Sequence, residues 1–122
     1  MPIVDVTLVA EPSISLAPDL AQSLADAIGR ALHSPPGRTW IRLHVLASSH
    51  YAENQSTLPA NDLPVFATVL QRQHPQASEF DRDISALTKA IAEATGRPPT
   101  CVHIEFAPEA AGRLSFGGKL VT

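Results

Sequence analysis

The sequence contains an internal repeat, and this feature restricts the possible folds more than any other. The proline pair Pro35-Pro36 is followed 63 residues later by Pro98-Pro99, and each pair follows a segment of helical periodicity. Each pair also precedes an alternating segment, WIRLHVLA in the first half and TCVHIEFA in the second. The same offset pairs Val6 with Val69, Leu24 with Leu87, Ala27 with Ala90 and Ile28 with Ile91. The period indicates one domain, residues 1–122, built from two copies of one unit, residues 2–58 and 62–122.

The first half predicts a strand, a helix and a second strand. Val4, Val6 and Leu8 alternate on one face of the first strand. The helix is predicted from about Pro18, since proline is tolerated in a first turn, and the prolines at 35–36 end it. Its core-facing stripe consists of Leu20, Leu24, Ile28 and Leu32.

The second half repeats this order. VFATVLQ is predicted as a strand, and the next helix is predicted to begin at Ser78, with Asp81 three residues on as in a capping motif. Its stripe is Ile84, Leu87, Ile91 and Ala94, and Gly96 is placed as its C-terminal cap. CVHIEF is the closing strand, and FGGKLVT predicts a glycine turn with a short edge strand.

Two such units predict an α+β fold with one four-stranded sheet. Crossover helices make the strands parallel within each unit and place both helices on one face. The other face would then be uncovered, so we expect the protein to form an oligomer.

Composition and charge exclude several classes of protein. The net charge is −3 and the basic residues are scattered, so nucleic acid is not an expected partner. No signal peptide is visible, and no run approaches the about 20 apolar residues of a membrane span. We therefore expect a soluble, cytoplasmic protein with no membrane partner. The histidines show no metal-ligand spacing and no phosphate-binding loop is present, so neither a metal nor a cofactor is expected.

The stretch MPIVDVTLV places a proline directly behind the initiator methionine. Methionine is normally removed before a small residue, so Pro2 is expected to carry a free secondary amine. A strand tolerates proline at its first residue but does not need it, because the repeat has Val65 at the equivalent place. Burial or a nearby arginine would lower the pKa of this amine and allow it to act as a base; a protonated Pro2 would instead be a general acid.

These features together resemble the tautomerase superfamily, which includes 4-oxalocrotonate tautomerase, macrophage migration inhibitory factor and malonate semialdehyde decarboxylase. The resemblance rests on MPIVDVTLV, the repeat of about sixty residues, PPGRTWIRLHV, and GRPPTCVHIEFAPEAAGRLSFGG. It implies a homotrimer whose sites surround the N-terminal proline and borrow residues from neighbouring subunits. It also implies a small carboxylate substrate and chemistry without a cofactor.

The resemblance carries over to several further residues. Arg72 matches a carboxylate-binding arginine, and a guanidinium can hold a carboxylate by two hydrogen bonds. Arg42 matches a strand arginine that reaches a neighbouring subunit's substrate, and His103 is its equivalent in the second half. Tyr51 lies close to the place of an aromatic wall residue, where it could pack against substrate or within its own loop. Arg113 could add a positive charge.

The sequence therefore predicts a tautomerase that uses Pro2 as general base on a small 2-keto or 2-hydroxy-dienoate acid. The alternative reaction is hydration, dehalogenation or decarboxylation of a three-carbon unsaturated or semialdehyde acid. It is less well supported because His74 and Pro75 stand where a second arginine would, and Gly37 stands near the place of the catalytic aspartate. The remaining alternative is a non-catalytic oligomeric binding module of the same fold.

Overall fold

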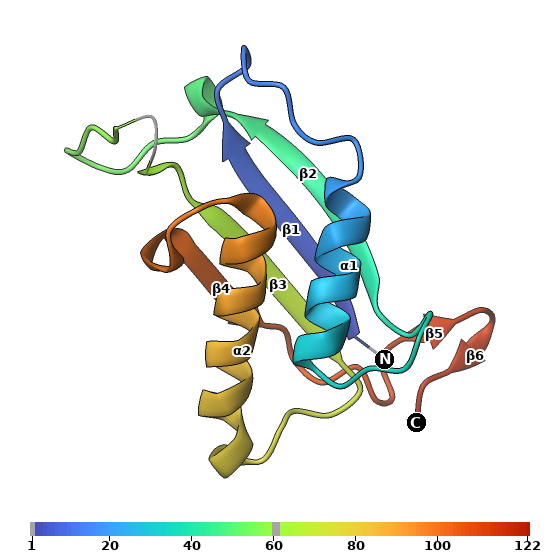
Figure 1. The fold of residues 1–122 in the computed structure, drawn as a ribbon. Helices are drawn as coiled ribbons and strands as arrows, with labels where there is room; N and C mark the ends of the chain where they lie inside the picture. The colour runs from blue at the N-terminus through green and yellow to red at the C-terminus, as the bar shows by residue number, and fades with distance from the viewer. Residues whose placement is uncertain (1, 60–61) are drawn as a thin grey trace.

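The computed structural model describes residues 2–59 and 62–122, and it shows the predicted α+β fold (Figure 1). The first half consists of β1 (Pro2–Ala10), α1 (Leu20–Ala31), β2 (Trp40–Ala47) and the 3₁₀ turn η1 (Ser48–His50). The second half consists of β3 (Val65–Gln71), α2 (Ala77–Thr95), the 3₁₀ turn η3 (Pro99–Cys101) and β4 (Val102–Phe106), followed by the short strands β5 (Ser115–Phe116) and β6 (Lys119–Leu120).

The sheet has the order β2-β1-β3-β4, so the two first strands of the units lie side by side at its centre. β1 is parallel to β2, and β3 is parallel to β4, as the crossover helices require. β1 and β3 are antiparallel, with Val4 opposite Val69 and Pro2 opposite Gln71. The two units are therefore related by a half-turn about the middle of the sheet.

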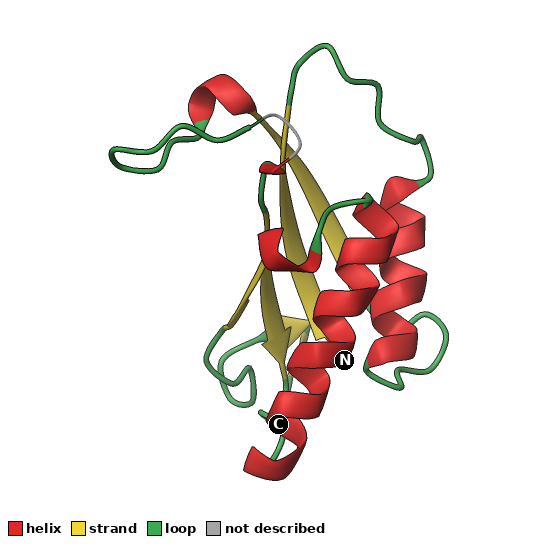
Figure 2. Ribbon diagram, turned by 60° about the vertical axis from the view of Figure 1, so that its left-hand side comes forward, coloured by secondary structure: helices red, strands yellow, loops and turns green. Residues whose placement is uncertain are grey.

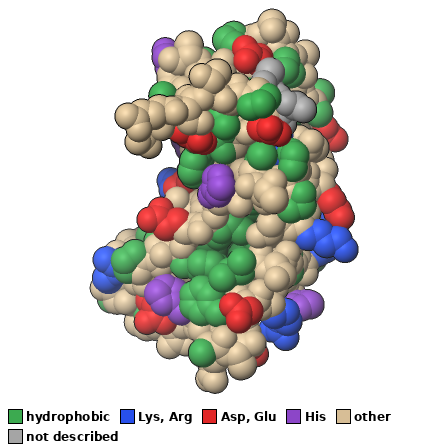
Figure 3. Space-filling view, turned by 90° about the vertical axis from the view of Figure 1, so that its left-hand side faces the viewer, with side chains coloured by type: hydrophobic (Ala, Val, Ile, Leu, Met, Phe, Trp, Pro, Cys, Tyr) green, Lys and Arg blue, Asp and Glu red, His purple; other side chains and the backbone are tan. Residues whose placement is uncertain are grey.

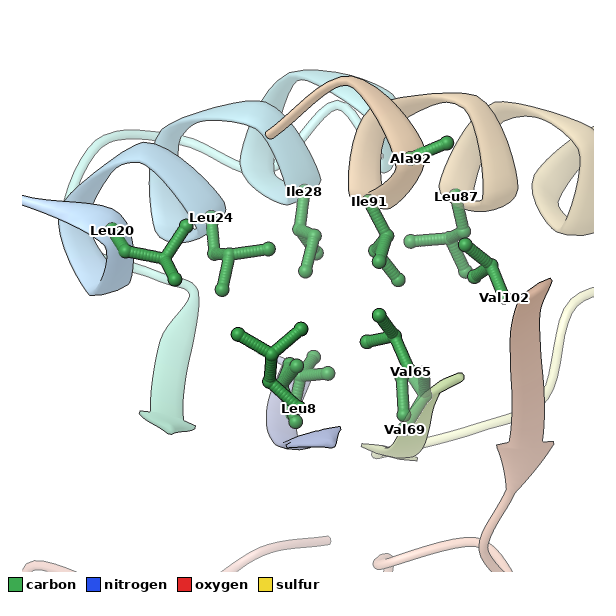
Figure 4. Packing of buried hydrophobic residues seen from close by; sticks show 13 residues of the cluster. Leu8, Leu20, Leu24, Ile28, Val65, Val69, Leu87, Ile91, Ala92 and Val102 are labelled. Atoms are coloured by element: carbon green, nitrogen blue, oxygen red, sulfur yellow. The ribbon is translucent and has the colours of Figure 1, made fainter. Parts of the chain in front are cut away.

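The core lies between the sheet and the helix pair, which covers one face only (Figure 2). Leu24 and Ile28 of α1 and Leu87 and Ile91 of α2 are fully buried and point toward the sheet, where they face Leu8 and its neighbours (Figure 4). These four residues form two of the pairs in the 63-residue repeat. The periodicity of each half thus arises from one shared hydrophobic layer.

The helix boundaries differ from the predictions at both N-termini. α1 begins at Leu20, and Pro18 lies in the turn before it. α2 begins at Ala77, and the predicted cap at Ser78 is wrong: the main-chain oxygen of Gln76 accepts from the N–H groups of Glu79 and Phe80 at 2.8 and 3.1 Å. Ser78 therefore lies inside the first turn, and no side chain caps this helix.

Two further predictions for the second half have opposite outcomes. Ile84 does not belong to the core stripe, because it is 39% exposed and lines a surface cavity beside Thr88 and Lys89. Gly96 is confirmed as the C-terminal cap, with the left-handed φ of 70° that favours glycine.

The carboxyl-terminal stretch FGGKLVT forms the predicted glycine turn. β5 and β6 pair with each other as a two-stranded antiparallel sheet and do not join the main sheet as an edge strand. The hairpin is attached to the sheet through aromatic packing, since the ring of Phe116 lies 4.4 Å from that of Trp40 at the start of β2.

The face of the sheet away from the helices carries both charged and aromatic side chains. Within the chain this face is open, and the segment that follows β2 projects on that side (Figure 2). In the view onto the β4 edge, hydrophobic side chains gather in patches between histidine and acidic side chains (Figure 3). Phe66 lies on the sheet face away from the helices and is 40% exposed, and the centre of its ring lies 5.2 Å from that of His103.

Candidate active site

The strand directions bring three separate segments to one end of the sheet. The start of β1 lies beside the start of β2 because these strands are parallel, and beside the end of β3 because that pair is antiparallel. A cavity of about 320 Å³ opens at this end. It is lined by Pro2, Leu32, His33, Ser34, Pro35, Gln71, Arg72 and Gln73.

Pro2 is buried at the edge of this cavity, on the same face of β1 as the core residues Val4 and Val6. Its ring therefore points toward the helix layer. Arg72 is the residue directly after β3 and lines the same cavity. The structure thus brings together the two residues that the sequence singled out most strongly.

The guanidinium of Arg72 is exposed, and in the described part of the chain it has a single hydrogen bond, from Nη1 to the main-chain oxygen of Thr122 at 3.1 Å. Main-chain bonds hold the carboxyl-terminal segment in place: the N–H of Gly112 donates to Val121 at 2.7 Å, that of Val121 donates to Leu114 at 2.8 Å, and that of Ala111 donates to Arg72 at 3.2 Å. Most of the donors of Arg72 are left available to an anion.

Two buried polar atoms in the lining of the cavity, Ser34 Oγ and Gln71 Oε1, have no hydrogen-bond partner among residues 2–59 and 62–122. A buried polar group without a partner costs about 1–3 kcal/mol, and few native groups are left in that state. Both residues line the same cavity as Pro2, where a water molecule or a bound ligand can donate to these atoms.

His33 lines the cavity with its backbone in the left-handed region, at φ 53°. A non-glycine residue in this region is uncommon and is more frequent near functional sites. The conformation follows the end of α1, where the N–H of His33 donates to Arg30 at 3.2 Å and that of Ser34 to Gly29 at 2.8 Å. It turns the chain from the helix to Pro35.

Arg42 lies on the open face of the sheet, away from the cavity of its own chain. Asp5 is its register partner on β1, and the guanidinium binds this carboxylate through Nε at 2.5 Å and Nη2 at 2.9 Å. This hydrogen bond and the charge of Asp5 raise the pKa of Arg42. A role for Arg42 in catalysis requires a second subunit.

Tyr51 and His103 also lie outside the cavity. Tyr51 follows η1 at the opposite end of β2, and its phenol donates to Glu53 at 2.7 Å, a bond that raises the pKa of the phenol. Its ring lies 5.9 Å from that of Phe66, and the ring of His103 lies 5.2 Å from the same phenylalanine. The three rings form one aromatic group on the open face.

Arg113 lies on the segment that passes beside Arg72, but it does not line the cavity. Its guanidinium donates to the main-chain oxygens of Glu109 at 3.0 Å and Pro108 at 3.4 Å. These bonds fix the turn that leads to the β5–β6 hairpin.

Sequence reasoning missed Leu32, His33, Ser34, Gln71 and Gln73 as cavity residues. A signal was available, because the parallel and antiparallel strand pairs together place the end of α1 and the end of β3 beside the first residue of the chain. The sequence contains no comparable signal for the direction in which each of these side chains points.

Over residues 2–59 and 62–122, no group of three or more His, Cys, Asp or Glu side chains could hold a metal ion. Within the same part of the chain, no helix has the length and apolar character needed to cross a membrane.

The architecture is that of the tautomerase fold, in which both β-α-β units pack their helices on one face of a four-stranded sheet. Solved structures of this class match nearly the whole chain. Fused 4-OT, described as an asymmetric trimer, superposes with a TM-score of 0.75 at 18% identity and covers 97% of this chain and 94% of its own. Macrophage migration inhibitory factor from Trichinella spiralis gives 0.71 at 16% identity, covering 97% and 98%.

A third structure, FG41 malonate semialdehyde decarboxylase inhibited by 3-bromopropiolate, gives a TM-score of 0.68 at 19% identity, covering 94% and 88%. No known family model and no curated protein matches the sequence. At these identities the likeness establishes the fold, whose members include enzymes with different reactions.

Proposed function

We propose that this protein is a tautomerase in which the amine of Pro2, freed by removal of Met1, is the general base. The observation that carries the proposal is that Pro2 and Arg72, far apart in the sequence, line one cavity. Arg72 binds the carboxylate of a small 2-keto or 2-hydroxy-dienoate acid, and Pro2 moves a proton between two atoms of the bound substrate.

The surroundings of Pro2 favour its neutral form. Burial and the positive charge of Arg72 both disfavour a protonated amine and lower its pKa. A neutral amine takes a proton from the carbon next to the substrate carbonyl, and the C–H electrons form an enolate. The protonated proline then returns that proton to the enolate oxygen, which gives the enol, or to another carbon of a dienolate, so the amine is regenerated.

The proposal is tested with untagged protein, since the N-terminus must be free and Thr122 contacts Arg72. Intact mass first establishes whether Met1 is removed, and a retained methionine excludes the mechanism. The ultraviolet absorbance of phenylenolpyruvate is then followed with the native protein and with Pro2→Ala. We expect Pro2→Ala to lose at least about a hundredfold in kcat/KM, as for a general base. Equal rates would favour the non-catalytic binding module.

The alternative reaction, on a three-carbon unsaturated or semialdehyde acid, has less support from the cavity. Arg72 is the one arginine among its lining residues, and none of them is an aspartate or glutamate that could activate water. Incubating the protein with malonate semialdehyde and with 3-haloacrylates, and measuring carbon dioxide and halide release, would reveal these activities.

We also propose that the protein forms a homotrimer through the open face of the sheet. The support is the exposed aromatic group at Phe66 on an uncovered sheet face, and the trimeric state named for fused 4-OT. In such an assembly Arg42 and His103 would meet a neighbouring subunit. Sedimentation equilibrium tests the stoichiometry, and a monomer at micromolar concentration would refute it.

A further inference from the structure

The side chain of Gln71 has no role in the mechanism described above, although it stands directly beside Pro2. Gln71 is the last residue of β3 and is the register partner of Pro2 in the antiparallel pair β1–β3. Side chains alternate along a strand, so residues two positions apart lie on the same face. Val69, two residues before Gln71, and Val4, two residues after Pro2, both face the core. The side chain of Gln71 and the ring of Pro2 therefore project from the same face of the sheet.

The main-chain bonds of Gln71 show how close the two side chains are. Its carbonyl accepts from the N–H of Ala110 at 2.8 Å, on the side of β3 away from β1. In an antiparallel pair the N–H and C=O of one residue point to the same side, so Pro2 and Gln71 form a non-hydrogen-bonded pair. In such pairs the Cα atoms lie about 4.5 Å apart and the side chains approach most closely.

The amide oxygen of Gln71 is buried, and none of the residues that the structure describes donates to it. A proline within a chain has no N–H, so Pro2 in a peptide bond offers none either. Removal of the residue before it changes this, because a neutral secondary amine has one N–H and a protonated one has two. The unpartnered acceptor thus lies opposite a residue that gains a donor when the N-terminus is processed.

We propose that Gln71 is a positioning residue whose Oε1 accepts a hydrogen bond from the Pro2 amine; this rests on the proposed function of Pro2. The neutral amine has one N–H and one lone pair. When the N–H is held by Gln71, the lone pair is aimed away from Gln71, toward the substrate space. The proton taken from the substrate carbon enters at the lone pair and leaves from there, while the proton held by Gln71 stays on the nitrogen throughout.

This arrangement has a measurable consequence for the amine. A hydrogen bond to a charged donor is stronger than one to the neutral donor, so Gln71 stabilises the protonated form and raises the amine pKa. Arg72 acts in the opposite direction. His33 is the other titratable side chain that lines the cavity. Gln71 therefore keeps the amine pKa from falling too far for the proton to be taken up.

The experiment is a titration of the Pro2 amine by ¹⁵N NMR in processed protein labelled with ¹⁵N-proline. We expect Gln71→Leu to lower the amine pKa by about 0.7 unit, the difference between a charged and a neutral hydrogen bond. Gln71→Glu restores the acceptor with a negative charge and is expected to raise the pKa by about 1 unit or more. Titrations in a His33→Gln background separate the ionisation of that histidine.

Gln22→Leu is the matched control, because the Gln22 amide lies on α1 and donates to Asp26 at 2.9 Å outside the cavity. It is expected to leave the amine pKa unchanged. Should Gln71→Leu fail to fold, Gln71→Asn tests the same contact, since its amide is one methylene too short to reach. An unchanged pKa in the folded Gln71 variants, or a raised pKa in Gln71→Leu, overturns the proposal.

The titration does not depend on turnover, so the two proposals fail separately. Shifted amine pKa values in a protein that does not convert phenylenolpyruvate would support the Gln71 contact and refute the tautomerase function. Activity that depends on Pro2, together with an unshifted amine pKa in the Gln71 variants, would support the tautomerase function and refute the Gln71 contact. A retained methionine refutes both.

Discussion

Replacement of Arg72 by alanine tests the proposed site most directly. The guanidinium is exposed and forms one hydrogen bond, to the main-chain oxygen of Thr122 at 3.1 Å, so its loss should barely change the melting temperature. Hydrogen bonds to a charged group contribute about 1.5–3 kcal/mol, which corresponds to roughly a 10- to 150-fold loss of kcat/KM for a carboxylate substrate. The loss should fall mainly on KM.

The matched assay compares phenylenolpyruvate with its methyl ester, which has no carboxylate charge. Arg72→Ala should reduce kcat/KM for the acid and leave the ester nearly unaffected. The same variant removes a positive charge near Pro2, so the amine pKa should rise and the acidic limb of the pH profile should move to higher pH. An equal loss for acid and ester would refute the assignment of Arg72 to the carboxylate.

Three further predictions concern the fold and the residues outside the cavity. Leu87→Ala should lower the free energy of unfolding by about 2–5 kcal/mol in urea titrations, because Leu87 is fully buried; a loss below 1 kcal/mol would contradict the core described above. Gly96→Ala should cost about 1–2 kcal/mol in the same titration, since φ is 70° there, whereas an unchanged midpoint would mean that the cap rearranges. Glu53→Gln should bring the pKa of the Tyr51 phenol back toward its ordinary value in a spectrophotometric titration without changing kcat, and an altered kcat would place Tyr51 in the site.

The fold could be predicted because the alternation of the strands, the periodicity of the helices and the residues that end them all indicate the same elements. β2 and β3 were predicted with the observed bounds, since WIRLHVLA and VFATVLQ alternate and are flanked by clear breakers. The stripe of α1 was found because Leu20, Leu24 and Ile28 are spaced at single helical turns and face one sheet. The glycine cap at Gly96 follows from the backbone conformation that only glycine adopts easily.

The errors arose where local chemistry competes with tertiary structure. Ile84 has suitable spacing for the core, but the side of α2 on which it lies borders a cavity instead of the sheet. Ser78 is a good cap by residue type, but the turn closes earlier through the carbonyl of Gln76. The residue types alone do not determine at which of two nearby residues a helix begins.

The site was predictable to the extent that it depends on unusual residues. Pro2 stands out because the repeat does not require it, and Arg72 because it follows a strand directly. Gln71 and Ser34 are ordinary surface residues by type, and only the structure shows that their buried side-chain oxygens lie in the cavity that Pro2 lines. The contact between Arg72 and Thr122 joins residues 50 positions apart and has no sequence pattern of its own.

The half-turn that relates the two units gives the sheet two comparable ends with different chemistry. At one end β1 starts with Pro2; at the other, β3 starts with Val65, which is fully buried and whose nitrogen is in a peptide bond. If Met1 is removed as proposed, only the first of these two similar corners gains a free amine. A circularly permuted chain that begins at position 65, with Val65→Pro, would place the proposed amine at the opposite corner. The corner that then bound a small acid would show whether the amine or the surrounding loops define the site.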